Sequence, residues 1–195
     1  MPEDAAVLID GGYMDKGLDG LGRPLVDLQK FSDELCRLSG NYDRFRTYYF
    51  HCAPFQSSPP TPVEKLRYSN WMKFYTAIQH HERFEIRLGK LEMRSCPRCG
   101  DTRPRQKRVD SQLAIDLVHL AAKGRIRKAI LVAGDSDHAP AVKMAKEDSI
   151  LVSLWHFPNN PKTVAHHELL QLCDERKEIT RAIINASLRP GAPTI

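Results

Sequence analysis

Residues 128–140 read Lys-Ala-Ile-Leu-Val-Ala-Gly-Asp-Ser-Asp-His-Ala-Pro. The run 129–133 is apolar, contains β-branched residues and ends at a glycine, which is typical of a buried strand in a parallel sheet. Two carboxylates, Asp135 and Asp137, follow at once, and the next residues are helix-like. Ligands of open α/β sheets bind beyond the carboxyl ends of the strands, where both acids are predicted to lie. The structural alternative puts Asp135 in a turn and Asp137 at a helix N-cap, and this segment alone favours that alternative.

A second apolar run, 5–9, also ends in a carboxylate, Asp10, and two glycines follow it. The glycines permit a tight turn and a close approach of the backbone to a ligand. Strand-like and helix-like segments alternate along the chain, which predicts an α/β fold with a parallel sheet and right-handed crossovers. Asp10 and Asp135 both follow strands, so we expect them at one edge of that sheet. They converge only where the two strands are neighbours.

The length and composition limit the class of protein. A chain of 195 residues predicts one domain, which we assign to 1–188, with a flexible proline-containing tail at 189–195. The N-terminal residues lack the basic region of a signal peptide, and no apolar run approaches the ~20 residues of a membrane helix. Five cysteines, an odd number, argue against a secreted disulfide scaffold, so we expect a cytoplasmic protein. The net charge of +5 permits nucleic acid as a partner without requiring it.

The remaining segments supply helices and an insertion. The segment 63–82 is helix-like, with Leu66 and Ile78 among its core candidates, and 163–173 and 175–188 are two further predicted helices.

An insertion is expected before the central helix. Residues 84–93 alternate apolar and polar side chains, which predicts a strand or a hairpin with Gly89 at its turn. Residues 94–108 then form a predicted basic loop around Cys96 and Cys99.

Four aspartates occupy junctions between predicted elements. They are Asp10, Asp110, Asp135 and Asp137, with Asp110 opening a predicted helix. Crowded like charges are costly unless a cation neutralises them, and Mg²⁺ prefers carboxylate oxygens. Such an ion can activate water and stabilise charge on a phosphodiester. Four unrelated caps and turns are the alternative for each residue taken singly, but their joint placement favours a metal site.

Three ordered motifs identify a family. Residues 7–13 (Val-Leu-Ile-Asp-Gly-Gly-Tyr), 107–117 (Lys-Arg-Val-Asp-Ser-Gln-Leu-Ala-Ile-Asp-Leu) and 131–137 (Leu-Val-Ala-Gly-Asp-Ser-Asp) together resemble the NYN domain. That family belongs to the PIN-like nucleases and includes the LabA-like bacterial proteins. The resemblance runs from about Ala5 to the helix after Trp155. It implies a three-layer α/β/α sandwich, PIN-like or Rossmann-like, with a mainly parallel sheet and a ribonuclease site that uses Mg²⁺ or Mn²⁺.

The resemblance also assigns roles to individual residues. Asp10 matches the metal ligand after the first strand, and Asp110 matches the aspartate at the start of the central helix. Asp135 and Asp137 match the acidic pair after the later strand. Asp116 falls on another acidic position of the family.

Three positions qualify this assignment. Six residues span about 600° of a helix, so Asp116 does not share a face with Asp110 and ranks below the other acids. Tyr13 stands where many family members carry Asn, and His138 stands where an aromatic residue is frequent. We expect His138 to be a packed or solvated residue at a helix start.

Cys96 and Cys99 have the spacing of half a tetrahedral zinc site. The other half requires Cys52, His51, His80 or His81, or a second subunit, which leaves a homodimer open. Two reduced thiols in a loop, or a redox pair, are the alternatives.

A basic run leads directly to Asp110. It comprises Arg94, Arg98, Arg103, Arg105, Lys107 and Arg108. Cations beside an acidic metal site guide a phosphate backbone toward it, so we predict that this run binds RNA; a solvated loop is the alternative.

The sequence therefore predicts a metal-dependent endoribonuclease. One competing hypothesis is a catalytically silent RNA-binding or regulatory module with the same fold. Another is a phosphatase of the haloacid dehalogenase type, which is disfavoured because Gly12 stands where that chemistry needs a second aspartate.

Overall fold

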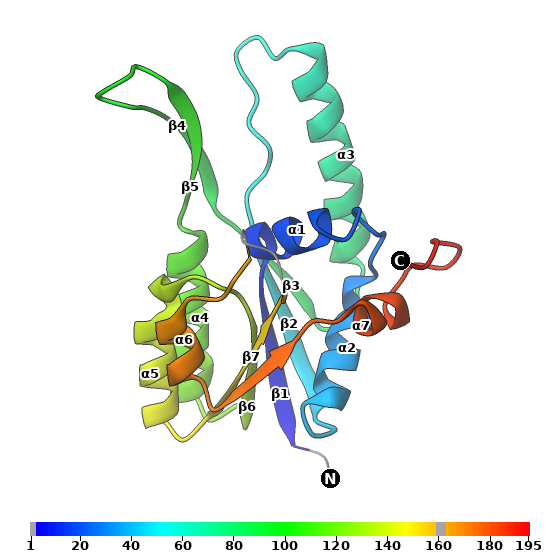
Figure 1. The fold of residues 1–195 in the computed structure, drawn as a ribbon, viewed down its shortest axis with the longest axis vertical. Helices are drawn as coiled ribbons and strands as arrows, with labels where there is room; N and C mark the ends of the chain where they lie inside the picture. The colour runs from blue at the N-terminus through cyan, green and yellow to red at the C-terminus, as the bar shows by residue number, and fades with distance from the viewer. Residues whose placement is uncertain (1–2, 159–162) are drawn as a thin grey trace.

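A computed structural model describes residues 3–158 and 163–195, except for the side chains of residues 103–105. Six parallel strands form one sheet, as the α/β prediction requires (Figure 1). In spatial order they are β3 (Phe84–Leu88), β2 (Asp43–His51), β1 (Asp4–Asp10), β6 (Lys128–Val132), β7 (Leu151–His156) and β8 (Glu175–Glu178). All residues of β6 are buried, which explains why its sequence is continuously apolar after the first position.

Helices cover both faces of the sheet, which confirms the three-layer sandwich. One face carries α4 (Val109–Ala122), α5 (Ala139–Glu147) and α6 (His167–Leu172). The other carries α1 (Gly11–Asp19), α2 (Leu28–Leu38), α7 (Arg181–Ala186) and the last turn of α3 (Pro62–Gln79). Alternate residues of each central strand enter opposite cores: Leu8 packs under α4, and Val7 and Ile9 pack under α2.

The strands β1 and β6 are neighbours at the centre of the sheet. Ile9 pairs with Val132 in parallel register, so the loops that begin with Asp10 and Ala133 leave the same edge. The expectation that Asp10 and Asp135 share an edge is therefore confirmed.

Two arms extend past this edge (Figure 1). One is the N-terminal part of α3, and the other is a two-stranded antiparallel hairpin formed by β4 (Lys90–Ser95) and β5 (Thr102–Lys107). Of the strand or hairpin predicted for residues 84–93, the strand is confirmed by β3. The hairpin turning at Gly89 was wrong, because β3 pairs with β2 in parallel and β4 pairs with β5. The prediction of Leu66 as a core residue was also wrong. It lies on the projecting arm and is 65% exposed, whereas Ile78 at the other end of α3 is buried.

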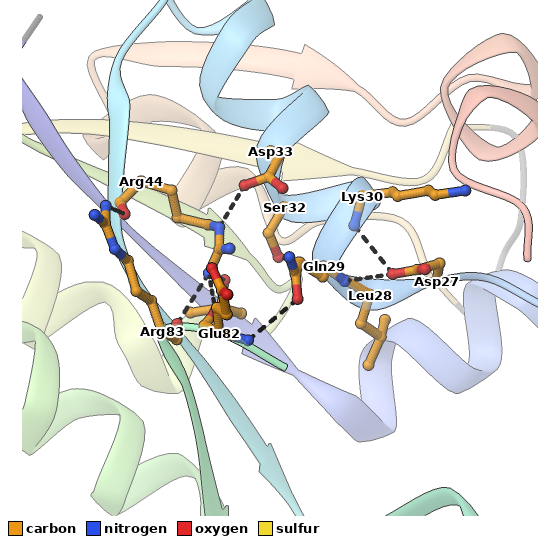
Figure 2. Close-up of polar contacts among 10 residues, drawn as sticks. Asp27, Leu28, Gln29, Lys30, Ser32, Asp33, Arg44, Glu82 and Arg83 are labelled. Carbon is orange, nitrogen blue, oxygen red and sulfur yellow. Dashed lines mark hydrogen bonds and ion pairs between the residues drawn. The ribbon is translucent and has the colours of Figure 1, made fainter. Parts of the chain in front are cut away.

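A buried arginine ties the amino ends of β2 and β3 to α2 (Figure 2). The Arg44 guanidinium donates to Asp33 Oδ1 (2.5 Å) and to the carbonyl oxygens of Glu82 (3.0 Å) and Arg83 (2.9 Å). Arg83 returns a hydrogen bond to the carbonyl of Arg44 at 3.0 Å. This network fixes the edge opposite the predicted site.

The prediction of a single helix at 175–188 was wrong, because this segment forms β8 followed by α7. Lys128 explains the strand. Its buried ammonium donates to Glu175 Oε1 and to the Ser39 carbonyl, both at 2.8 Å, and so holds the start of β8 against the sheet. In the segment 189–195, expected to be flexible, the Asn185 side chain bonds both the N–H (2.9 Å) and the carbonyl (3.0 Å) of Ile195.

Across the described ranges, no helix combines the length and the apolar character needed to cross a membrane.

Candidate metal centre

Asp10 ends β1 and begins α1. Its Oδ1 accepts a hydrogen bond from the Tyr13 N–H at 3.1 Å, as a helix N-cap does, and Oδ2 has no such role in the cap. Gly11 is required directly after it, because a Cβ there would lie 2.8 Å from the Phe50 carbonyl oxygen. The strand, the cap and the glycine therefore fix the Asp10 carboxylate at the carboxyl edge of the sheet.

Asp110 lies in the first turn of α4 and meets Asp10 from the neighbouring layer. The residue before this helix start, Arg108, has a left-handed backbone (φ 72°), which redirects the chain from β5 into α4. The pKa of Asp110 is raised, mainly by partial burial. The charges of Asp10, Asp135 and Asp137 raise it further, and the interaction with His138 opposes them without reversing the shift.

His138 is the third member of the group. Ligand atoms of Asp10, Asp110 and His138 all lie within 4.8 Å of one another. The His138 ring is fully buried (0% exposed), yet neither nitrogen has a hydrogen-bond partner among the residues that the structure describes. Buried polar atoms without partners are rare in folded proteins and indicate a site for an ion or water, a reactive group or strain. The sequence prediction of a packed His138 is correct as far as burial goes, but packing does not satisfy its nitrogens.

Asp135 and Asp137 stand beside this group with exposed side chains. Asp135 Oδ1 accepts a hydrogen bond from the Asp137 N–H at 3.1 Å and caps the short 3₁₀ helix η1 (Ser136–His138). This cap places His138 at the end of η1, facing the buried side of α4. The structural alternative was right about a turn at Asp135 and wrong about the cap, which is Asp135 and not Asp137. The charges of Asp135 and Asp137 act on the Asp110 carboxyl, but neither acid belongs to the group of ligand atoms that lie within 4.8 Å of one another.

The donor atoms fit a divalent cation. Two carboxylates and one imidazole suit Mn²⁺ and related ions, whereas Mg²⁺ favours oxygen ligands and water. Ligand atoms around one such ion lie about 3 Å apart, so modest side-chain rotations bring the three residues into contact with it. Among the described residues this is the one group of three or more acidic, cysteine or histidine side chains that meets the distance limit for a shared ion.

Comparison with known families agrees with this geometry. The family model described as the NYN domain matches residues 4–179. The chain belongs to the NYN family. NYN domains are part of the PIN-like nuclease superfamily, and the match spans the whole sheet and all four junction aspartates. A search of curated proteins returned no match.

Tyr13, which departs from the NYN pattern, has a structural role here. Its buried hydroxyl donates to the Thr163 carbonyl (2.8 Å) and accepts from the Phe157 N–H (3.0 Å). Burial raises the pKa of Tyr13 to about 12, so the phenol stays protonated and holds the loop after β7 against α1. A side chain at Gly134 would strike the Tyr13 ring at 2.4 Å, which explains that glycine in the third motif.

Asp116 does not join the acidic group of this NYN domain. Its Oδ2 accepts from Arg87 Nε at 3.0 Å, and the Arg87 guanidinium also lies over the Tyr48 ring at 5.5 Å. Asp116 therefore links α4 to the edge strand β3, consistent with the helical-angle argument that separated it from Asp110.

The predicted RNA-binding residues lie on or next to the β4–β5 hairpin. Arg94 and Arg98 are exposed, as are Lys107 and Arg108 nearer to α4. Lys107 forms an ion pair with Glu92.

Two of the predicted residues are described only by their backbone. The register sets Arg94 opposite Arg103 and Glu92 opposite Arg105, and the side chains of Arg103 and Arg105 lie outside the described residues. The hairpin register also sets Lys90 opposite Lys107.

Sequence reasoning missed one histidine–carboxylate pair beside the site. His51 ends β2, next to β1 in the sheet, and its Nε2 lies 2.9 Å from Asp15 Oδ2 on α1. Burial lowers the pKa of His51, but the hydrogen bond and charge of Asp15 outweigh this effect and raise it overall. The signal was available, because His51 ends a predicted strand rich in aromatic residues, just as Asp10 ends an apolar one.

Proposed function

We propose that this NYN domain is a metal-dependent endoribonuclease whose cation is held by Asp10, Asp110 and His138. The observation that carries the proposal is the buried His138 ring. Its two nitrogens lack partners in the described chain, and one ligand atom of the ring lies within 4.8 Å of ligand atoms of Asp10 and Asp110. A core packed only for stability disfavours such an arrangement, because each orphaned polar group costs about 1–3 kcal/mol. A bound ion removes that penalty for the nitrogen that ligates it and neutralises the acids.

The bound cation would supply acidity to a water molecule and positive charge for the phosphodiester oxygens. The chain's own residues supply the geometry. Asp10 and Asp110 fix the position of the charge between β1 and α4, and the exposed carboxylates of Asp135 and Asp137 accept hydrogen bonds from water at the mouth of the site. Hydrolysis forms one P–O bond to the water oxygen and breaks another, and the leaving oxygen receives a proton.

RNA is the proposed substrate because the site lies at the base of a basic hairpin. Like charges directly opposite in a two-stranded sheet are destabilising. The register sets Arg94 opposite Arg103, whereas Lys90 and Lys107, which also lie opposite each other, share the Glu92 carboxylate. Arg94 and Arg98 add exposed positive charge toward the tip. A phosphate backbone lying along the hairpin relieves this repulsion and releases counterions.

The test is incubation of the purified chain with mixed RNA and Mn²⁺, Mg²⁺ or a chelator. We expect cleavage with Mn²⁺, less with Mg²⁺ and none with chelator. Asp110→Asn keeps the side-chain size and removes a ligand charge, so it should abolish cleavage while the protein still melts cooperatively. RNA binding without cleavage by the metal-loaded wild-type chain would instead favour the silent binding module.

A further inference from the structure

The tip of the β4–β5 hairpin is a closed knuckle that carries two thiols. The Cys96 N–H donates to the Asp101 carbonyl (2.7 Å), and the Gly100 N–H donates back to the Cys96 carbonyl (2.9 Å). Gly100 has a positive φ of 72°, which lets the chain reverse within the tip. Outside this turn, the Ser95 and Thr102 hydroxyls share a hydrogen bond of 3.1 Å that closes the ladder. Cys96 and Cys99 are thus held on one tight turn.

The backbone of the knuckle is arranged to stabilise a thiolate. The N–H groups of Cys99 and Arg98 and the Cys99 thiol form hydrogen bonds with the Cys96 sulfur. N–H donors around a sulfur ligand orient it and tune its affinity for a metal. Both cysteines are free thiols, and Cys99 is exposed to solvent. The pair is therefore prepared for a soft cation such as Zn²⁺.

The same chain offers no third ligand at this position in its described part. The three other cysteines are buried in the two cores: Cys36, Cys52 and Cys173. His51 is engaged with Asp15, and His80 and His81 follow α3 just before β3 begins, at the opposite edge of the sheet from the hairpin. The one described group of three or more possible ligands that lie together is the acidic centre, which excludes both hairpin thiols.

Structural zinc sites are closed, with four protein ligands in a tetrahedron. We propose that the tip binds Zn²⁺ through Cys96 and Cys99, and that the same two residues of a second copy complete a four-thiolate site. A two-fold axis through the ion makes the two halves identical, as in most homodimers. The four thiols release their protons to solvent as the ion binds. The hairpin extends beyond the sheet and its covering helices (Figure 1), so its tip is accessible to a second copy.

A zinc ion shared between two copies would also stabilise the hairpin. A lone two-stranded sheet is marginally stable in water, and small units without a core depend on metals or disulfides. Leu91 at the base packs on the core, but Met93 nearer the tip is 40% exposed. A metal at the tip fixes the end that packing leaves free.

The experiment measures zinc content by elemental analysis and mass by light scattering, on the full chain purified without chelator and under reducing conditions. We expect one zinc per two chains and twice the mass of the 22.2 kDa chain. The double variant Cys96→Ser, Cys99→Ser should lose the zinc and become a monomer, with the thermal melting of the sandwich retained. Substituting Co²⁺ should give the strong visible absorption of tetrahedral thiolate coordination.

Met93→Ser is the matched control, because it removes an exposed apolar side chain from the same hairpin and keeps both thiols. It should keep the zinc and the dimer. Zinc-free protein with both thiols reduced, a Cys96–Cys99 disulfide, one zinc per monomer, or a dimer that survives in the double serine variant would each overturn the proposal. Neither readout involves RNA, so the outcome is independent of the proposed nuclease activity.

Discussion

The Asp10 carboxylate and the Tyr13 backbone are joined by a hydrogen bond of 3.1 Å, so the residue that starts α1 is also a member of the proposed metal centre. The two roles use different properties of the side chain. Capping needs an oxygen acceptor, which Asn also supplies, whereas cation binding needs the negative charge. Substitution can therefore separate them.

Asp10→Asn should abolish RNA cleavage and the stabilisation of the protein by Mn²⁺, while metal-free melting holds or rises because one crowded charge is gone. Asp10→Ala should in addition lower the metal-free stability by ~1 kcal/mol through loss of the cap. Thermal melting with and without Mn²⁺, alongside a cleavage assay, measures both effects.

Asp27 provides the matched control for a cap alone. It caps α2 by accepting hydrogen bonds at Oδ1 from the N–H groups of Gln29 (3.0 Å) and Lys30 (3.1 Å) (Figure 2), and it is not a member of the acidic group. Asp27→Asn should leave cleavage and the Mn²⁺ response unchanged. An Asp10→Asn variant that behaves like Asp27→Asn would show that Asp10 is a cap and not a ligand.

The sheet and the position of the acids were predictable because each rests on a strong local pattern. The buried runs before Asp10 and Asp135 identify central parallel strands, and such strands bring their carboxyl ends to one edge. Only the pairing of β1 with β6 had to be learned from the structure.

Other features depend on contacts distant in sequence. Glu175–Glu178 has the charged composition of an exposed helix and becomes a strand because β7 and Lys128 hold it. Leu66 has core spacing, but periodicity does not tell which part of a long helix leaves the body. The orphaned nitrogens of His138 are likewise invisible in sequence, because an unpaired buried group is defined by what surrounds it.

The His51–Asp15 pair predicts a pH-dependent stability. The folded pKa of His51 is raised, so its contribution is fully present below the unfolded pKa of about 6.5 and is lost as the pH rises through the folded pKa. Asp15→Asn should therefore melt below wild type at about pH 5.5, and the difference should shrink by about pH 8.5. Thermal melting across this range measures the effect.

Asp19→Asn is the control on the same helix. Asp19 pairs with Arg23, whose charge is constant over this range, so its melting difference from wild type should not depend on pH. An Asp15→Asn difference that is equally flat would mean that His51 does not take up a proton in this window.

The basic hairpin predicts a change in salt dependence. Replacing Arg94, Arg98 and Arg108 with Gln should weaken RNA binding and reduce the slope of log K against log salt by about 2, since each lost phosphate contact on a single strand removes about 0.7. Titrations of catalytically inactive Asp110→Asn protein with RNA at several salt concentrations give both quantities.

A charge-matched control lies at the opposite edge of the sheet. Lys123, Arg125 and Arg127 are exposed and precede the amino end of β6. Their triple Gln variant should bind RNA with nearly unchanged salt slope. Equal losses in the two triple variants would indicate that net charge, and not the hairpin, governs binding.

His138 gives the sharpest test of the proposed metal centre. Its replacement should keep or raise the metal-free stability, and it should lower the affinity for Mn²⁺ relative to that for Mg²⁺. His138→Leu replaces a buried ring without hydrogen-bond partners in the described chain by an apolar side chain, so the metal-free stability should hold or rise. It also removes the nitrogen donor and leaves carboxylates, which should weaken Mn²⁺ binding more than Mg²⁺ binding. Calorimetric titration with each ion measures the ratio of the two affinities, and thermal melting measures the stability.

His119, an exposed histidine on α4, provides the control, and His119→Leu should leave that ratio unchanged. If His138→Leu destabilises the metal-free protein and keeps the wild-type ratio, His138 is a packing residue and the ligand set must be redrawn around the aspartates alone.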